Sequence, residues 1–206
     1  MVSIFKHALR YTAAASLLAG VATLYAAKAD AQDTVVEFEP AQTKVEFTLG
    51  DVLHTVHGTF KLKKGVIRFD PSTGVASGTL VIDAASGDSG SGARDSRMNK
   101  NILESQKFRD IVFTPRHVKG QVAAQGDSQV EVEGTFTLHG SDHPLTLLAK
   151  VTAKDGQMTA ATHFVVPYVQ WGLKNPSTFI LRVSDKVEID IHAAGHVATT
   201  WTKTAP

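Results

Sequence analysis

The feature that most constrains this chain is a regular alternation of apolar and polar residues along much of its length. The alternation is clearest in four segments: 44–49, 130–138, 145–151 and 187–193. Successive side chains of a strand point to opposite faces of a sheet, so each segment has one apolar face and one solvated face. Buried parallel strands read instead as unbroken apolar runs. The pattern therefore predicts an antiparallel sheet.

Turn-forming residues and one helical segment interrupt the alternation. Asp70–Gly74 carries Pro and Gly at turn positions and predicts a hairpin. Asp95–Gln106 alone has helical character, because Met98, Ile102 and Leu103 fall at helical spacing among polar residues. We therefore expect one short helix inserted near the middle of the chain, between two strands.

The number of alternating segments predicts a single all-β domain of about eight to ten strands without an internal linker. All of its apolar faces must be covered, and a closed antiparallel barrel turns each face inward while removing exposed edges. A barrel of about eight strands also has room inside for a small or elongated ligand. A β-sandwich is the main alternative from the pattern alone.

The first thirty residues have the features of a secretory signal peptide. Lys6 and Arg10 precede the uncharged, Ala- and Leu-rich run 11–27, and Ala29-Asp30-Ala31 offers small residues for cleavage. We expect cleavage after Ala31, which leaves residues 32–206 as one exported domain, periplasmic or secreted, without a permanent membrane anchor. An uncleaved anchor is the alternative, although the run is at the short limit for spanning a bilayer.

Composition excludes several kinds of chemistry. The chain has no Cys, which rules out disulfides, thiolate catalysis, Cys-ligated zinc and iron–sulfur clusters. Lys and Arg number 21 against 20 Asp and Glu, a formal net charge of +1. This balance supplies no general attraction for phosphate backbones, so nucleic acid is not an expected partner.

One segment resembles the nucleophile motif of chymotrypsin-type proteases. Gly87-Asp88-Ser89-Gly90 has the residue types, but it lies early in the domain, whereas that family places it after the catalytic His and Asp. A loop made of turn-forming residues is the better interpretation. No nucleophile elbow, P-loop or dinucleotide fingerprint occurs in the sequence.

Nine His residues raise the question of a metal site. His54 and His57 are three apart, which on a strand places them on opposite faces. His192 and His196 share a face but lie roughly 13 Å apart on an extended strand. His139 and His143 flank a turn and could converge, but two ligands alone make a weak site. We expect no metal.

A series of short segments occurs in a recognisable order between about Val36 and Val197. They are Val45–Phe47, His57–Phe60, Gly65–Asp70, Ser77–Asp83, Ser86–Ser89, Arg94–Asp95, Phe108–Pro115, Gly134–Gly140 and Val183–Val187 with Ile189. Their order and spacing resemble the YceI family of lipid- and polyisoprenoid-binding proteins, a lipocalin-like group often exported to the periplasm. The resemblance implies an extended antiparallel eight-stranded barrel with an apolar tunnel, a helix covering one end, and no cofactor.

Within such a tunnel, an isoprenoid or acyl tail gains about 0.8 kcal/mol per buried CH₂ group, and a few polar groups at the mouth orient the head group. The inward-facing candidates for ligand contact are Phe47, Leu49, Phe60, Phe113, Phe136, Leu138 and Leu147. For each of them, ordinary barrel core is an equal alternative.

Two further candidates match the family's Arg-Asp pair at the tunnel-end helix, namely Arg94 and Asp95. The resemblance suggests that Arg94 meets a phosphate or carboxylate head group. The alternative is an Arg–Asp pair that fixes the start of the helix.

The sequence departs from the family pattern in two places. Many members have a His four residues after the strand Phe, where this chain has Asp51, and His54 is nearby. Many also have an Arg-x-Asp-aromatic-Gly segment, which here reads Tyr168-Val169-Gln170-Trp171-Gly172. Trp171 remains a candidate ligand contact, but both charges are gone, which favours a neutral or amide-type amphiphile.

The sequence therefore predicts an exported, non-catalytic binding protein for a long-chain amphiphile, either a polyisoprenoid or a fatty acid or amide. The first alternative is a periplasmic hydrolase acting on a lipid-like substrate, which requires His54 or His139 beside a Ser or Asp inside the cavity. The second is a structural or stress-response accessory whose barrel is filled. A homodimer is compatible with the sequence.

Overall fold

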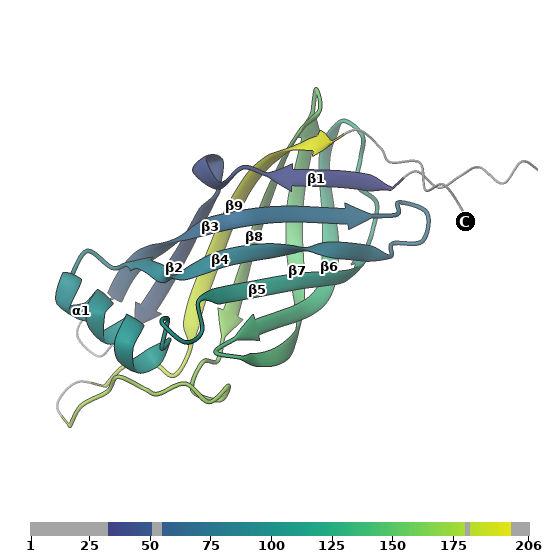
Figure 1. The fold of residues 1–206 in the computed structure, drawn as a ribbon. Coiled ribbons are helices and arrows are strands. Elements are labelled where there is room, and N and C mark those ends of the chain that lie inside the picture. The colour runs from purple at the N-terminus through teal and green to yellow at the C-terminus, as the bar shows by residue number, and fades with distance from the viewer. Residues whose placement is uncertain (1–32, 51–54, 180–181, 199–206) are drawn as a thin grey trace, which may run out of the picture.

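A computed structural model describes residues 33–50, 55–179 and 182–198. The expected signal peptide, Asp51 and His54 lie outside the described residues. Nine strands form one antiparallel sheet (Figure 1). They are β1 Thr34–Phe38, β2 Lys44–Gly50, β3 Thr55–Phe69, β4 Ala76–Asp88, β5 Asp110–Lys119, β6 Gly126–Leu138, β7 Ser141–Lys154, β8 Gln157–Val166 and β9 Val187–Ala198.

These nine strands fill eight positions of a closed barrel. β1 and β2 both pair with β3 on one side and with β9 on the other, so they are two halves of one strand. The 3₁₀ turn η1, Pro40–Gln42, separates them. Every other strand pairs with its sequence neighbours from β3 through β9. The expected eight-stranded antiparallel barrel is confirmed, and the sandwich alternative is wrong.

The barrel has two different ends. At the end that we call the helix end, a short helix and the described residues of the β8–β9 connection, 167–179 and 182–186, lie together (Figure 1). At the other end, which we call the turn end, short turns join β3 to β4 and β7 to β8. β1 begins and β9 finishes at the turn end (Figure 1).

The predicted Asp70–Gly74 turn joins β3 to β4 and is built around one carboxylate. Asp70 Oδ1 accepts hydrogen bonds from the Ser72 backbone N–H (2.7 Å) and hydroxyl (2.6 Å), and Oδ2 accepts from the Thr73 hydroxyl (2.8 Å). These bonds, chiefly the one from the Ser72 hydroxyl, lower the pKa of Asp70 to about 2. Gly74 has a φ of 74°, which favours glycine.

The helix begins and ends earlier than the sequence predicted. Instead of spanning Asp95–Gln106, it consists of α1, Gly92–Arg97, followed by the π-helical turn η2, Met98–Ile102. The correction has a local cause, because Glu104 adopts a φ of 46° and the backbone of Lys107 and Phe108 turns back to bond its carbonyl. This left-handed residue ends the helical path before Gln106.

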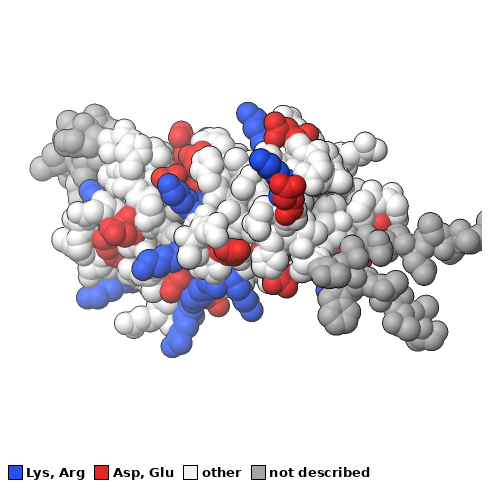
Figure 2. Space-filling view, turned by 90° about the horizontal axis from the view of Figure 1, so that it is seen from above, with Lys and Arg blue, Asp and Glu red and all other residues white. Residues whose placement is uncertain are grey.

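The inward-facing alternates of the strands form the core, and the outward-facing alternates are mostly polar. Phe38, Val45, Phe113, Leu147 and Val151 are all buried. On the outer face shown in Figure 2, acidic and basic side chains are interspersed. Within the described part of the chain, no helix has the length and apolarity needed to cross a membrane.

Candidate functional site

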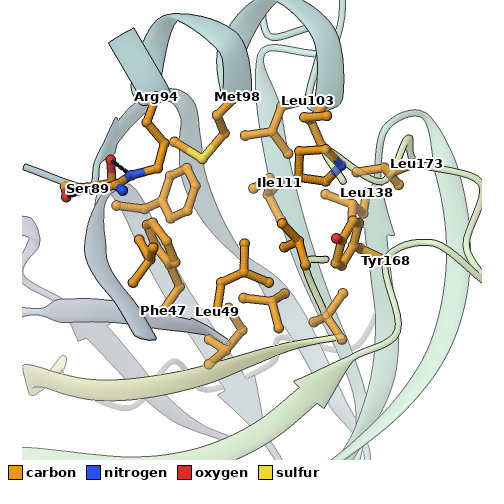
Figure 3. Close-up of a pocket in the computed structure, with 18 of the residues that line it drawn as sticks. Phe47, Leu49, Ser89, Arg94, Met98, Leu103, Ile111, Leu138, Tyr168 and Leu173 are labelled. Atoms are coloured by element: carbon orange, nitrogen blue, oxygen red, sulfur yellow. Dashed lines mark hydrogen bonds between the residues drawn. The ribbon is translucent and has the colours of Figure 1, made fainter. Parts of the chain in front are cut away.

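The interior of the helix end contains a cavity of about 260 Å³ (Figure 3). Its walls come from six strands, β2, β3, β5, β6, β8 and β9, and from the two segments that cover its end. The lining residues are Phe47, Leu49, Val56, Phe60, Ser89, Arg94, Arg97, Met98, Ile102, Leu103, Ile111, Phe136, Leu138, Val166, Tyr168, Leu173, Pro176, Val183, Val187 and Ile189. Most of these side chains are apolar, so the cavity favours an apolar occupant.

The helical segment covers this cavity with three apolar side chains. Met98, Ile102 and Leu103 all line it, and Figure 3 shows Met98 and Leu103 pointing inward. The backbone N–H of Leu103 bonds the carbonyl of Met98 at 2.9 Å, five residues back, as in a π-turn. The wider turn places Ile102 and Leu103, adjacent in sequence, on the same face. The sequence correctly predicted the apolar face of this helix, but it placed the first and last residues of the helix too late.

Ser89 connects the end of the barrel wall to the helix. Its hydroxyl donates to Asp95 Oδ1 (2.5 Å) and accepts from Arg94 Nε (2.8 Å), and its carbonyl accepts from Arg94 Nη2 (2.8 Å). Asp95 Oδ1 also accepts from the Ser89 backbone N–H at 2.9 Å. Ser89 is buried. Arg94 and Asp95 therefore meet through Ser89, which holds the guanidinium at the cavity wall (Figure 3).

A second arginine links the helix to the connection between β8 and β9. Arg97 lines the cavity, and its Nη2 donates to the Pro176 carbonyl at 3.1 Å. In the same connection, the Tyr168 hydroxyl donates to the Ser184 carbonyl at 2.6 Å. Burial, with a smaller contribution from the Asp185 carboxylate, raises the pKa of Tyr168 to about 12. These bonds fix the connection over the cavity.

A second cavity of about 90 Å³ lies in the turn end of the barrel. Its walls are apolar except for Thr162. No described residue lines both cavities. The barrel interior thus holds two cavities with different described lining residues, whereas the family resemblance implied one tunnel.

Nine of the ten predicted ligand residues fall into three groups. Six of them line the helix-end cavity: Phe47, Leu49, Phe60, Arg94, Phe136 and Leu138. Phe113 and Leu147 line the turn-end cavity instead. Asp95 lines neither cavity and holds Ser89.

Trp171, the remaining candidate, packs beside the helix-end cavity without lining it. Its ring stacks on His143, with centroids 4.0 Å apart and planes inclined by 5°. It also lies 5.8 Å from the ring of Phe136, which does line the cavity. Trp171 therefore supports the wall from behind.

The histidines do not form a catalytic or metal-binding cluster in the described residues. His139 packs on Phe108, with ring centroids 4.2 Å apart, and its Nε2 lies 3.6 Å from Glu104 Oε2. His57 bonds Thr48, and His196 lies between Glu37 and Glu39. Among the described lining residues of the helix-end cavity there is no His, Asp or Glu. His54, which the hydrolase alternative also invoked, lies outside the described residues.

Sequence reasoning missed Arg97, Tyr168 and the other contributors from the β8–β9 connection. The connection has no period-two or helical pattern, so nothing in it indicated that it turns back over the barrel. A signal for Arg97 was available, since it lies one residue before Met98 on the predicted helix and three after Arg94. Residues at that spacing lie on one helical face.

A closed antiparallel barrel with an apolar interior and a helical segment across one end defines the class of lipocalin-like barrels. The sequence model of the family described as YceI-like domain matches residues 37–194. The chain belongs to this family.

Two relatives align with much of the chain. A UPF0312 protein of Pseudomonas syringae pv. tomato is 31% identical over 138 residues, covering 66% of this chain and 70% of the relative. A UPF0312 protein of Vibrio cholerae is 25% identical over 171 residues, covering 81% of this chain and 88% of the relative.

Two solved structures show the same fold. BcnA from Burkholderia cenocepacia superposes with a TM-score of 0.63 at 19% identity, covering 79% of this chain and 99% of BcnA. A polyisoprenoid binding domain from Saccharophagus degradans superposes with a TM-score of 0.58 at 16% identity, covering 79% of this chain and 98% of that domain.

Proposed function

We propose that this protein is a non-catalytic binding protein that holds the tail of a long-chain amphiphile in its helix-end cavity. The single observation that carries the proposal is the cavity of about 260 Å³ with apolar walls and two arginines among its lining residues. Transfer of the tail from water into the cavity is favourable by about 0.8 kcal/mol for each CH₂ group that is buried. The polyisoprenoid-binding domain with the same fold supports a lipid-type ligand of this kind.

The polar side of the cavity indicates which head groups fit. Arginine has only donors. Arg94 and Arg97 each use some of their donors on protein carbonyls or hydroxyls, and no carboxylate lines the described part of the cavity. A matching head group must supply acceptor oxygens, which a carboxylate, a phosphate or an amide carbonyl can do. The fatty acid and fatty amide classes both satisfy this requirement.

A first experiment asks whether a ligand is present at all. Native mass spectrometry of gently purified protein should show a bound amphiphile, and dodecanoate or dodecanamide should bind to protein stripped of it. Protein that carries no ligand and also refuses added fatty acid, fatty amide and polyprenyl compounds would show the proposal to be wrong.

A second experiment separates the head group from the tail. Arg94→Gln should weaken dodecanoate binding roughly tenfold, because a charge-assisted hydrogen bond is lost. Dodecanamide binding should change less. Lys100→Gln is the matched control, since Lys100 lies in the same helical segment but does not line the cavity. Calorimetric titration measures the affinity of each variant for the two ligands. If Arg94→Gln and Lys100→Gln lose equal affinity, Arg94 does not contact the head group.

The remaining parts of the proposal concern location and assembly. We propose that residues 1–31 direct export and are removed, so that the domain acts in the periplasm or outside the cell. Mass measurement of the protein from a producing cell tests this, with Gln32 as the expected first residue. A homodimer stays a prediction, which sedimentation analysis checks.

A further inference from the structure

A layer of buried side chains separates the two cavities. Four buried residues from four strands lie between the cavities and line neither of them: Val45 on β2, Leu62 on β3, Ile82 on β4 and Phe164 on β8. We call these four residues the dividing layer. All of them belong to the hydrophobic core cluster and are no more than 8% exposed.

Their place in each strand shows that they lie between the cavities. On β8, Thr162 lines the turn-end cavity and Val166 lines the helix-end cavity, and Phe164 is the inward-facing residue between them. On β3, Leu62 follows Phe60, which lines the helix-end cavity, and precedes Ile67, which lines the turn-end cavity. Leu62 also pairs with Ile82 across strands β3 and β4.

An aromatic ring completes the layer on the side of β6. Gly134 is the inward-facing position between Val132, of the turn-end cavity, and Phe136, of the helix-end cavity. A Cβ atom at Gly134 would lie 2.7 Å from Phe113 Cζ, so the Phe113 ring occupies the space that a side chain there would need. Phe136 and Phe164 meet edge to face, with ring centroids 5.9 Å apart. The glycine thus admits a ring that helps to fill the barrel.

The volume of the first cavity limits the length of tail that it buries. At roughly 30 Å³ for each water-sized group, its volume of about 260 Å³ holds about nine methylene groups. The turn-end cavity of about 90 Å³ adds space for about three more if the two are joined, at the same roughly 30 Å³ each.

We propose that the dividing layer sets how much of an amphiphile's tail this protein buries, with Phe164 as the principal length-determining residue. This inference rests on the proposed function. In the wild-type protein the first nine or so carbons are buried, and the remainder of a longer tail stays outside the barrel. Each buried carbon strengthens binding about fourfold, which corresponds to the transfer of one CH₂ group, and further carbons add nothing.

The test is a length series of straight-chain carboxylates from hexanoate to hexadecanoate, titrated calorimetrically below the concentration at which each forms micelles. Wild-type affinity should rise about fourfold per carbon and level off near decanoate. Phe164→Ala should move that break to longer chains by three carbons or more, because it removes a ring from the layer and joins the two cavities. Phe164→Leu, a milder change, should move it less.

Two matched variants distinguish the layer from a general loosening of the core. Phe69 is equally buried and lines the turn-end cavity, so Phe69→Leu enlarges the second cavity without opening the layer. It should leave the break unchanged. In the Phe164→Ala protein, Ala193→Leu fills the turn-end cavity and should return the break toward its wild-type position. Circular dichroism confirms that each variant is folded.

The possible outcomes separate this inference from the function beneath it. Binding that strengthens steadily from hexanoate to hexadecanoate in the wild type, or a break that stays in place in folded Phe164→Leu and Phe164→Ala proteins, overturns the dividing layer as a length limit. If no carboxylate of any length, no fatty amide and no polyprenyl compound binds, the proposed function itself is wrong.

Discussion

The two ends of this barrel are made from the same eight strand positions, yet they differ in what surrounds the interior. The helix end has the larger cavity, bordered by Ser89 and two arginines and covered by the helical segment and the β8–β9 connection. The turn end has a smaller and almost wholly apolar cavity, and short turns join its strands. The alternating strands supply a common apolar interior, and the connections decide which end receives polar groups.

The largest effect should come from the same substitution made at each end. Phe69→Ala at the turn end should reduce the free energy of unfolding by about 3–5 kcal/mol, as for other buried Phe residues. Both rings border a cavity, but Phe47 faces the larger one, about 260 Å³ against about 90 Å³, so it has fewer contacts to lose and Phe47→Ala should cost less. Urea unfolding measures the two stabilities. Equal losses of unfolding free energy would show that the side chains around the helix-end cavity are packed as tightly as those at the turn end.

Ligand binding should respond to this pair in the opposite order. Phe47→Ala removes a wall of the helix-end cavity and should weaken dodecanoate binding. Phe69→Ala should leave binding within about twofold in folded protein, an energy difference of about 0.4 kcal/mol. Calorimetric titration measures both. A loss of binding only in Phe69→Ala would place the occupied site at the turn end.

A smaller effect should come from adding a methyl group at two glycines, one against the backbone of the barrel wall and one beside the helix-end cavity. A Cβ at Gly195, on β9, would collide with the Glu37 carbonyl of β1, whose backbone has no room to retreat within the barrel wall. Gly195→Ala should therefore cost about 1–3 kcal/mol. A Cβ at Gly87 meets the end of the flexible Met98 side chain and the Phe60 ring, both of which border the helix-end cavity. Gly87→Ala should cost less than 1 kcal/mol. Thermal unfolding compares them, and the reverse order would contradict the difference between the ends.

The hydrogen bond from Tyr168 to Ser184 tests the covering connection. Tyr168→Phe should reduce the free energy of unfolding by about 1 kcal/mol, because the hydrogen bond that joins Tyr168 to Ser184 within the connection is lost. The raised pKa of Tyr168 also has a pH consequence: the folded protein holds the phenol neutral, whereas the unfolded chain ionises it near pH 10. Its stabilising contribution is complete below pH 10 and is lost as the pH rises toward 12. Unfolding curves of wild type and Tyr168→Phe should converge over that range, and parallel curves would contradict this.

The smallest effect should appear at the turn end in acid. The pKa of Asp70 is lowered in the folded protein to about 2, so its contribution is present above the unfolded value of 3.8 and is lost as the pH falls through 2. Asp70→Asn should remove the part of the stability loss that falls between pH 3.8, the pKa in the unfolded chain, and about pH 2, the pKa in the folded protein. Because the turn is exposed, the difference in melting temperature should be small. An unchanged acid profile would show that the turn does not depend on this carboxylate.

The fold could be predicted because the apolar residues of a period-two alternation are the ones that face inward. Phe47, Phe136 and Leu138 were placed inside on that basis and are inside. Alternation does not say how far along the barrel a residue lies. Phe113 and Leu147 were grouped with Phe47 for this reason, but they line the other cavity. Position along the barrel depends on strand tilt and register, which come from pairings between distant residues.

Other parts of the site depend on contacts that no local pattern records. The meeting of Arg94 and Asp95 at Ser89 joins the end of β4 to the helix, although the adjacent pair itself was visible in the sequence. The stack of Trp171 on His143 brings the β8–β9 connection against β7. The dividing layer combines three consecutive strands, β2, β3 and β4, with β8 much later in the chain. Gly134 acquires its role only because the Phe113 ring lies against it.

The divided first strand also has a consequence for how the chain reaches its native state. β1 and β2 complete the barrel by pairing with β9, so the seam joins Val36 to Val197 and Phe47 to Ile189. Bringing together segments so distant in sequence requires the closure of nearly the whole chain, which is slow compared with forming the hairpins between neighbouring strands. Until β9 arrives, the free edges of β1, β2 and β8 are open to pairing with other chains. Closing this seam is therefore the step at which correct folding competes with aggregation.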